Sequence, residues 1–133
     1  MKKAILILVT AVLLVSCLND DGPKYRLEFL PIESSITPET LTFGEVDTIS
    51  VKYNLPNSCY SFNDLYYEVK DTTRIVAIRA AVQLDATCTQ ATIEKDFKFT
   101  FTVSQTQDYV FRFFKGFDAD GEEIFDDVVI PVD

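Results

Sequence analysis

The chain contains no histidine and no tryptophan, and only four of its 133 residues are glycine. Without histidine, Ser-His-Asp and Cys-His catalytic arrangements are excluded, because both need an imidazole base. Four glycines leave no glycine-rich phosphate loop. Carboxylate pairs for glycoside hydrolysis remain open, since 21 Asp and Glu residues always offer pairs. We therefore predict that the protein is not an enzyme, with a small hydrolase as the least favoured alternative.

Positive charge is also scarce, with 12 Lys and Arg against 21 Asp and Glu and a net charge of −9. Nucleic acids and anionic membrane surfaces both repel such a chain. The sequence therefore predicts no nucleic-acid partner. The acidic balance suits a solvated exterior and could favour cationic partners or calcium.

The N-terminus has the order of a secretory signal. Two lysines follow the first methionine, an apolar run broken only by Thr10 continues to residue 15, and Ser16 precedes Cys17. This is a basic region, a hydrophobic region and a small residue before a cleavage site. The run is shorter than the roughly 20 residues that a membrane span needs. We expect residues 1–16 to be a signal peptide.

Residues 14–17, Leu-Val-Ser-Cys, resemble the lipobox of bacterial lipoproteins. This resemblance implies that Cys17 carries fatty acyl chains such as palmitate and becomes the mature N-terminus. It implies a lipid anchor in an oxidising cell envelope, at the outer membrane or cell surface. Loss of residues 1–16 leaves 117 residues, the size of one domain, and removes two lysines, so the net charge becomes −11.

Residues 17–24 have the polar, acidic composition of a flexible tether. The run Asn-Asp-Asp at positions 19–21 loosely resembles the surface-export signal of lipoproteins in the Bacteroidetes group. A plain linker is the alternative. The domain proper is expected over residues 25–133.

The lipobox resemblance also accounts for the odd number of cysteines. With Cys17 acylated, Cys59 and Cys88 remain as one pair in an oxidising compartment, and we expect a disulfide between them. The closed loop would stabilise the fold by about 3–4 kcal/mol. Two cysteines without histidine cannot build the usual four-ligand zinc site.

From residue 25 onward the pattern is that of β-strands. Apolar residues alternate with polar ones over residues 48–53 and most sharply over 92–103. Residues 74–84 form the longest run, for which a helix over 77–86 is the alternative, although β-branched residues favour a strand. Residues 34–39 are expected to be a loop. About seven or eight short strands separated by turns predict an antiparallel β-sandwich.

From about residue 40 onward the chain looks like an immunoglobulin-like β-sandwich domain of a small bacterial lipoprotein. Tyr109, directly after Asp108 at the start of a late strand, resembles the tyrosine corner of such folds. Two features depart from the pattern. No tryptophan can pack on the disulfide, and the spacing from Cys59 to Cys88 is shorter than in antibody domains. The resemblance concerns architecture and carries over no functional residue.

Two groups of residues are candidates for binding. Asp118, Asp120 and Glu122 resemble the start of an EF-hand calcium loop, but they lack its third ligand before the glycine, its length and its flanking helices. An acidic hairpin turn facing water is the favoured alternative. No other cofactor is expected.

The second group consists of aromatic residues beside loop amides. Its members are Tyr60, Tyr66, Tyr67 and Asn63. Exposed tyrosines near amides could bind a glycan or a peptide. The favoured alternative is that the tyrosines fill the core or its rim.

Together these patterns predict a non-catalytic, lipid-anchored module. It would bind a protein or glycan partner through the loops of the sandwich. One alternative is a protease-inhibitor-like binder that uses loops at one end of the sandwich, by analogy of fold. The other is a calcium-dependent binder that uses the acidic hairpin.

Overall fold

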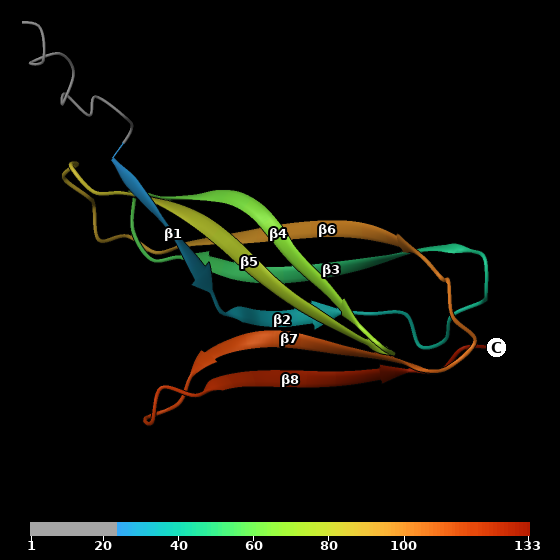
Figure 1. The fold of residues 1–133 in the computed structure, drawn as a ribbon. Helices are drawn as coiled ribbons and strands as arrows, with labels where there is room; N and C mark the ends of the chain where they lie inside the picture. The colour runs from blue at the N-terminus through green and yellow to red at the C-terminus, as the bar shows by residue number, and fades with distance from the viewer. Residues whose placement is uncertain (1–23) are drawn as a thin grey trace, which may run out of the picture.

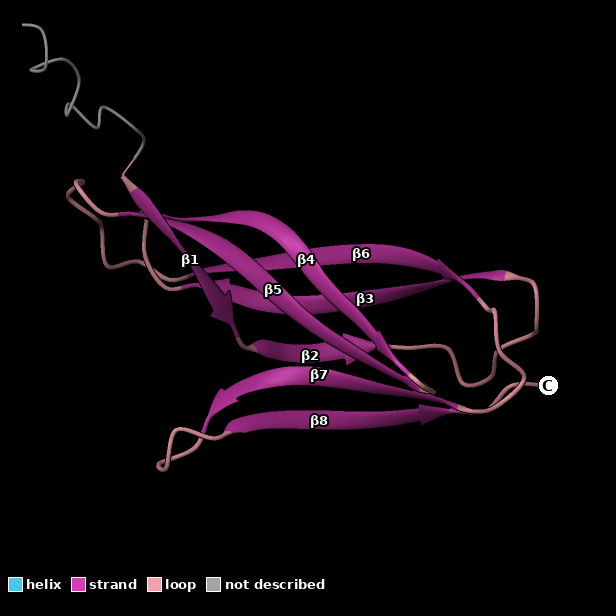
Figure 2. Cartoon of the chain, viewed as in Figure 1, coloured by secondary structure: helices cyan, strands magenta, loops and turns pink. Residues whose placement is uncertain are grey.

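The computed structural model describes residues 24–133, which form two packed β-sheets (Figure 1). These residues contain strands and loops but no helix (Figure 2), and so none that could cross a membrane. The predicted β-sandwich is confirmed. The signal peptide and the lipidation of Cys17 lie outside the described residues. The strands are β1 (Tyr25–Leu30), β2 (Ile32–Ile36), β3 (Val46–Leu55), β4 (Tyr60–Lys70), β5 (Thr73–Gln83), β6 (Ile93–Thr102), β7 (Tyr109–Phe117) and β8 (Glu123–Ile130).

The larger sheet has five strands and is built around β5. Strand β4 pairs with one edge of β5, while β1 and β7 share the other edge end to end. Strand β8 follows on the far side of β7. The smaller sheet has the order β2-β3-β6. The outer face of the five-stranded sheet is therefore not covered by any other described element.

A proline explains how the chain passes between the sheets. Strand β1 ends at Leu30 in the larger sheet, and β2 begins at Ile32 in the smaller one. Pro31, between them, has no N–H for a ladder and so stops β1 from continuing along β5. The expected loop over residues 34–39 was wrong in its first half, because residues 34–36 pair with β3.

One strand pair departs from the antiparallel expectation. Residues 73–76 of β5 pair in parallel with residues 110–113 of β7, whereas the other paired strands are antiparallel. Parallel neighbours need a long crossover connection. Strand β6, in the opposite sheet, supplies that crossover.

The core contains the side chains that the alternating patterns point inward. Tyr109, Phe111 and Phe113 of β7 are each at most 1% exposed, and their rings stack in sequence with centroids 5.8 and 6.1 Å apart. Residues 77–83 belong to β5, so the helical alternative for this stretch was wrong. The core also contains inward residues of β3 and β5, among them Ile49, Val51, Tyr53, Val76, Ile78 and Ala80.

The tyrosine corner is present. Tyr109 is the first residue of β7, and its hydroxyl accepts a hydrogen bond of 2.9 Å from the backbone N–H of Ser104. The guanidinium of the buried Arg74 lies 4.7 Å from the centre of the Tyr109 ring. Arg74 also donates to the carbonyl of Asp71 and to the side chain of Gln105. The corner thereby ties the β4–β5 turn to the loop before β7.

The disulfide predicted between Cys59 and Cys88 is confirmed. It joins the residue before β4 to the long connection between β5 and β6. The buried Cys59 anchors one end, while Cys88 lies near the surface. The disulfide therefore holds a connection that has no strand of its own.

Candidate functional site

A β-bulge in β7 brings two phenylalanines to the outer face of the five-stranded sheet. The pairing with β8 is irregular between Phe114 and Gly116, so Lys115 is an extra residue in the strand. Gly116 has a φ of +113°, which an L side chain rarely adopts. Because of this extra residue, Phe114 and Phe117 face the same side of the sheet, with their ring centroids 5.4 Å apart.

Three other aromatic rings extend this pair into a cluster. Phe125, opposite it on β8, lies 6.1 Å away between centroids, and Phe29 of β1 lies 6.1 Å away on the other side. Tyr66 of β4 packs edge to face on Phe29 at 5.4 Å. Edge-to-face packing is the favourable geometry for such pairs. Four strands thus each contribute aromatic side chains to one cluster.

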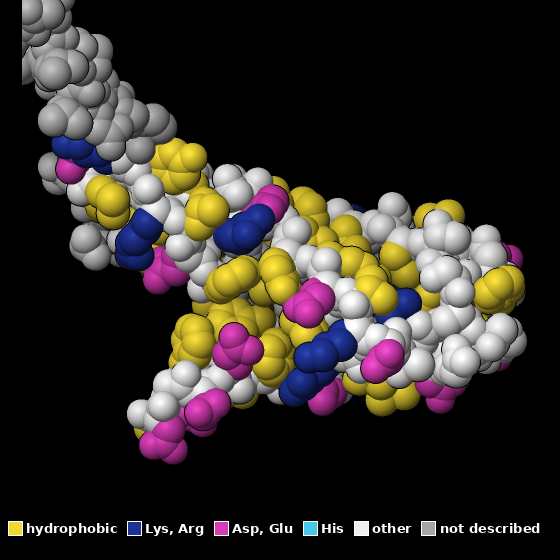
Figure 3. Space-filling view, viewed as in Figure 1, with side chains coloured by type: hydrophobic (Ala, Val, Ile, Leu, Met, Phe, Trp, Pro, Cys, Tyr) yellow, Lys and Arg dark blue, Asp and Glu magenta, His cyan; other side chains and the backbone are white. Residues whose placement is uncertain are grey.

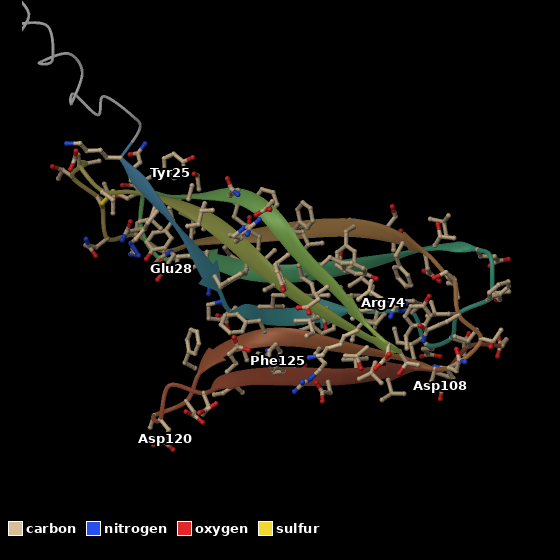
Figure 4. All side chains as sticks on the ribbon, in the orientation of Figure 1. Tyr25, Glu28, Arg74, Asp108, Asp120 and Phe125 are labelled. Carbon is tan, nitrogen blue, oxygen red and sulfur yellow. A yellow bond between two sulfur atoms is a disulfide. The ribbon has the colours of Figure 1, made fainter. Side chains whose placement is uncertain are left out.

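This cluster lines a groove of about 350 Å³, which we call the aromatic groove; its remaining lining includes Ile75 and Ala77 of β5 and the carboxylates of Glu68 and Glu123. Its volume is within the range of small-ligand sites. Phe117 is 60% exposed and Phe29 40% exposed, whereas Phe114 forms the buried floor. Hydrophobic side chains gather on this face beside the acidic hairpin (Figure 3). Phe125 and the hairpin residue Asp120 are marked in Figure 4.

The aromatic groove is acidic. The Tyr66 hydroxyl donates a 2.6 Å hydrogen bond to Glu68. This bond, burial and the charge of Glu123 raise the pKa of Tyr66. Glu68 of β4 and Glu123 of β8 therefore act on the same hydroxyl from different strands. Among residues 24–133, neither carboxylate forms an ion pair.

The arginines around the groove already have anionic partners. Arg79 forms a bidentate pair with Asp64 and lowers the pKa of that carboxyl group. Arg112 donates to Asp127 at 3.0 Å, while its guanidinium lies 4.4 Å from the centre of the Phe125 ring. These cations leave the charges of Glu68 and Glu123 uncompensated.

A second hollow, of about 590 Å³, continues from the aromatic groove and shares Phe29, Phe114 and Phe117 with it. Its wall includes Glu28, whose buried Oε2 accepts no hydrogen bond from the described residues. Arg26 approaches this oxygen only to 3.7 Å. The Glu28 carboxylate, together with burial, raises the pKa of Tyr60. The two hollows therefore border each other at these three phenylalanines.

Of the four residues proposed from sequence as a ligand surface, only Tyr66 lines the aromatic groove. Tyr60 and Tyr67 are partly buried and pack against the core, and Tyr60 also lines the second hollow. Asn63 is the extra residue of a bulge in β4 and hydrogen-bonds Asp64. This bulge reverses the alternation, so that Tyr60 and Tyr67 point inward although an odd number of positions separates them. The sequence carries no marker of that reversal.

The three acidic residues proposed for calcium lie at the β7–β8 turn. The carboxylate of Asp118 accepts hydrogen bonds from the backbone N–H groups of Asp120 and Glu122, at 2.8 and 2.9 Å. Gly121 has the positive φ expected of this turn. Within residues 24–133, no three acidic or cysteine side chains form a group suited to a metal ion. Calcium binding by this turn stays a prediction.

The sequence reasoning missed the phenylalanines of the groove. Phe114 could partly have been predicted from the sequence. Phe113 and Phe114 are neighbours, and two successive side chains of a strand point to opposite faces of the sheet, so one of the two rings must lie on the outer face. Phe117 gave no such signal, since strict alternation from Tyr109 places it with the core. Phe29 and Glu68 lie on strands whose pairing partners could not be inferred.

These features define a small β-sandwich domain with an acidic aromatic groove on one open sheet face. The model of the ORF11 beta-sandwich domain family matches residues 49–124, more than half of the chain. The protein belongs to this family. The matched segment carries Tyr66, Phe114 and Phe117 but ends before Phe125. No curated protein and no solved structure matches the chain.

Proposed function

We propose that the protein is a non-catalytic, lipid-anchored module of a bacterial cell envelope that binds a partner through the aromatic groove. The observation that carries this proposal is the cluster of aromatic rings on an uncovered sheet face. Phe117 is 60% exposed and Phe29 is 40% exposed, whereas other aromatic side chains of the domain are buried in the core. Contiguous exposed apolar groups rimmed by polar residues mark interaction sites. The binding surface is thus a sheet face rather than the end loops expected from sequence.

The lipid anchor is supported by the cysteines. The disulfide between Cys59 and Cys88 suits an oxidising compartment and uses both cysteines of the domain. Cys17 is then left for acylation, in the lipobox-like stretch described above. The loosely matching acidic residues after Cys17 favour a surface lipoprotein of the Bacteroidetes kind. The partner would then be a protein or a glycan of the envelope or its surroundings.

Localisation tests the first half of the proposal. Mass spectrometry of the native protein should show a chain that starts at Cys17 and carries fatty acyl groups. Cys17→Ser should move the protein from the membrane fraction to the soluble fraction, whereas Cys59→Ser/Cys88→Ser should leave it in the membrane fraction. An unprocessed N-terminus would refute the lipid anchor.

Crosslinking in intact envelopes tests partner binding. Phe117→Ala should reduce capture of the partner, because it removes the most exposed ring of the groove. Phe43→Ala is the matched control, since Phe43 is 56% exposed and lies in the loop before β3. If Phe117→Ala and Phe43→Ala capture the partner equally well, the aromatic groove is not the binding surface.

The non-catalytic assignment rests on residue types. The chain has no histidine, and the acids of the groove lie among phenylalanine rings. Turnover of saccharide or peptide substrates that Glu68→Gln abolishes would contradict the assignment and favour a small hydrolase.

A further inference from the structure

We propose that the aromatic groove binds a cationic peptide segment of a protein partner, with a lysine or arginine side chain held between Tyr66, Glu68 and Glu123. This inference rests on the proposed function and names its ligand class. The apolar residues next to that cation would lie over Phe114 and against the exposed Phe29 and Phe117.

Hydrogen-bonding capacity favours a cation over a saccharide. Among residues 24–133, the only side-chain donor that lines the aromatic groove is the hydroxyl of Tyr66, and it already donates to Glu68. The groove therefore offers acceptors and aromatic faces. Lysine and arginine carry donors and no acceptor, whereas every sugar hydroxyl is also an acceptor. A donor-only ligand matches this lining.

Charge favours the same ligand. Glu68 and Glu123 have no cationic partner among the described residues, whereas Arg79 and Arg112 are paired. An ammonium or guanidinium group beside Tyr66 would interact with both carboxylates and with the aromatic rings around it. A second copy of this acidic chain is a poor occupant, because its net charge of −9 repels the groove.

The shape favours an extended segment over a small amine. The second hollow adjoins the aromatic groove at Phe29, Phe114 and Phe117, and Glu28 is part of its lining. Volumes of about 350 and 590 Å³ are too large in combination for a single ammonium group. A peptide with basic and apolar side chains in alternation could use both hollows.

The experiment is a calorimetric titration of the folded protein, with its disulfide intact, with three probes. They are a blocked pentapeptide of alternating phenylalanine and lysine, the same peptide with glutamate in place of lysine, and maltohexaose. We expect the lysine peptide to bind at least about tenfold more tightly than the glutamate peptide, and more weakly as salt is added. Tighter binding of maltohexaose, or equal binding of the two peptides, would overturn the inference.

Charge-removing variants locate the binding. Glu68→Gln/Glu123→Gln should weaken lysine-peptide binding by about tenfold or more, because both carboxylates lose their charge. Glu39→Gln/Glu45→Gln removes the same charge from exposed positions in the β2–β3 connection and should leave binding within about twofold, since screening weakens distant charges. If both double variants weaken lysine-peptide binding equally, the effect comes from the net charge of the protein, and the proposed site is refuted.

Two further outcomes separate this inference from the proposed function. If Phe117→Ala lowers partner capture in envelopes but Glu68→Gln/Glu123→Gln does not, the module stands and the cationic ligand is wrong. If neither variant changes capture, the groove is not the binding surface and both proposals fail. Self-association that Phe117→Ala abolishes, measured by sedimentation, would assign the groove to a second copy instead. Thermal melting of each variant checks that it is folded.

Discussion

Removal of one hydroxyl group from the tyrosine corner tests how the two sheets are tied together. Tyr109→Phe keeps the ring that stacks on Phe111 and lies under Arg74, and it removes only the acceptor of the Ser104 N–H. Ser104 is exposed, so water can replace the lost acceptor. The expected loss is therefore the net value of one hydrogen bond, about 0.5–1.5 kcal/mol, rather than the larger cost of an unsatisfied buried group.

Urea unfolding of the disulfide-bonded domain measures this loss. A decrease of about 1 kcal/mol in the free energy of unfolding should lower the urea midpoint by about 0.5 M, for an m-value of about 2 kcal/mol/M. Tyr109→Ala should cost about 3–5 kcal/mol, because it leaves a cavity beside Phe111. Tyr25→Phe is the control, since Tyr25 is half exposed. If Tyr109→Phe and Tyr25→Phe unfold at the same urea concentration, the corner contributes nothing and the reasoning is wrong.

Three other perturbations have definite expected results. Cys59→Ser/Cys88→Ser should lower the free energy of unfolding by about 3–4 kcal/mol, measured in urea, because the unfolded chain regains the freedom of the closed loop. Gly116→Ala should lower the free energy of unfolding by about 1–3 kcal/mol, measured in urea, since alanine is strained at a φ of +113°. An unchanged free energy of unfolding would argue against the bulge. The pKa of Asp64 is lowered by Arg79, so its contribution to stability is present above the unfolded pKa of about 4 and is lost as the pH falls through the lower folded value. Melting temperatures of wild type and Asp64→Asn should therefore converge in acid, and parallel curves would contradict the pairing.

The predicted strands were most accurate where one face of a strand is buried and the other meets water. Ile49, Val51 and Tyr53 alternate with polar residues, and all three are buried as expected. The pattern failed at Leu84, the last residue of the longest predicted run, which is 54% exposed because β5 ends at Gln83. It also failed where a bulge shifts the alternation. Local hydrophobicity reports a face only while the strand keeps its register.

The candidate sites fared differently because they depend on pairing between distant strands. The acidic turn was located from sequence, since an Asp-Gly pair fixes a turn through its own backbone. The aromatic groove was not, because its walls come from β1, β4, β7 and β8 and meet only in the assembled sheet.

By itself the sequence determined an all-β domain and the absence of an imidazole base, because these follow from residue type and periodicity. The disulfide and the tyrosine corner were predicted from the resemblance to lipoproteins and to immunoglobulin-like domains. Only the tertiary structure decided that β5 and β7 run parallel and that β1 and β7 share an edge of β5. It also decided that Phe117 faces outward beside Phe114. The physical reason is that strand pairing and bulges are fixed by hydrogen bonds between residues far apart in the chain, which leave little trace in local sequence.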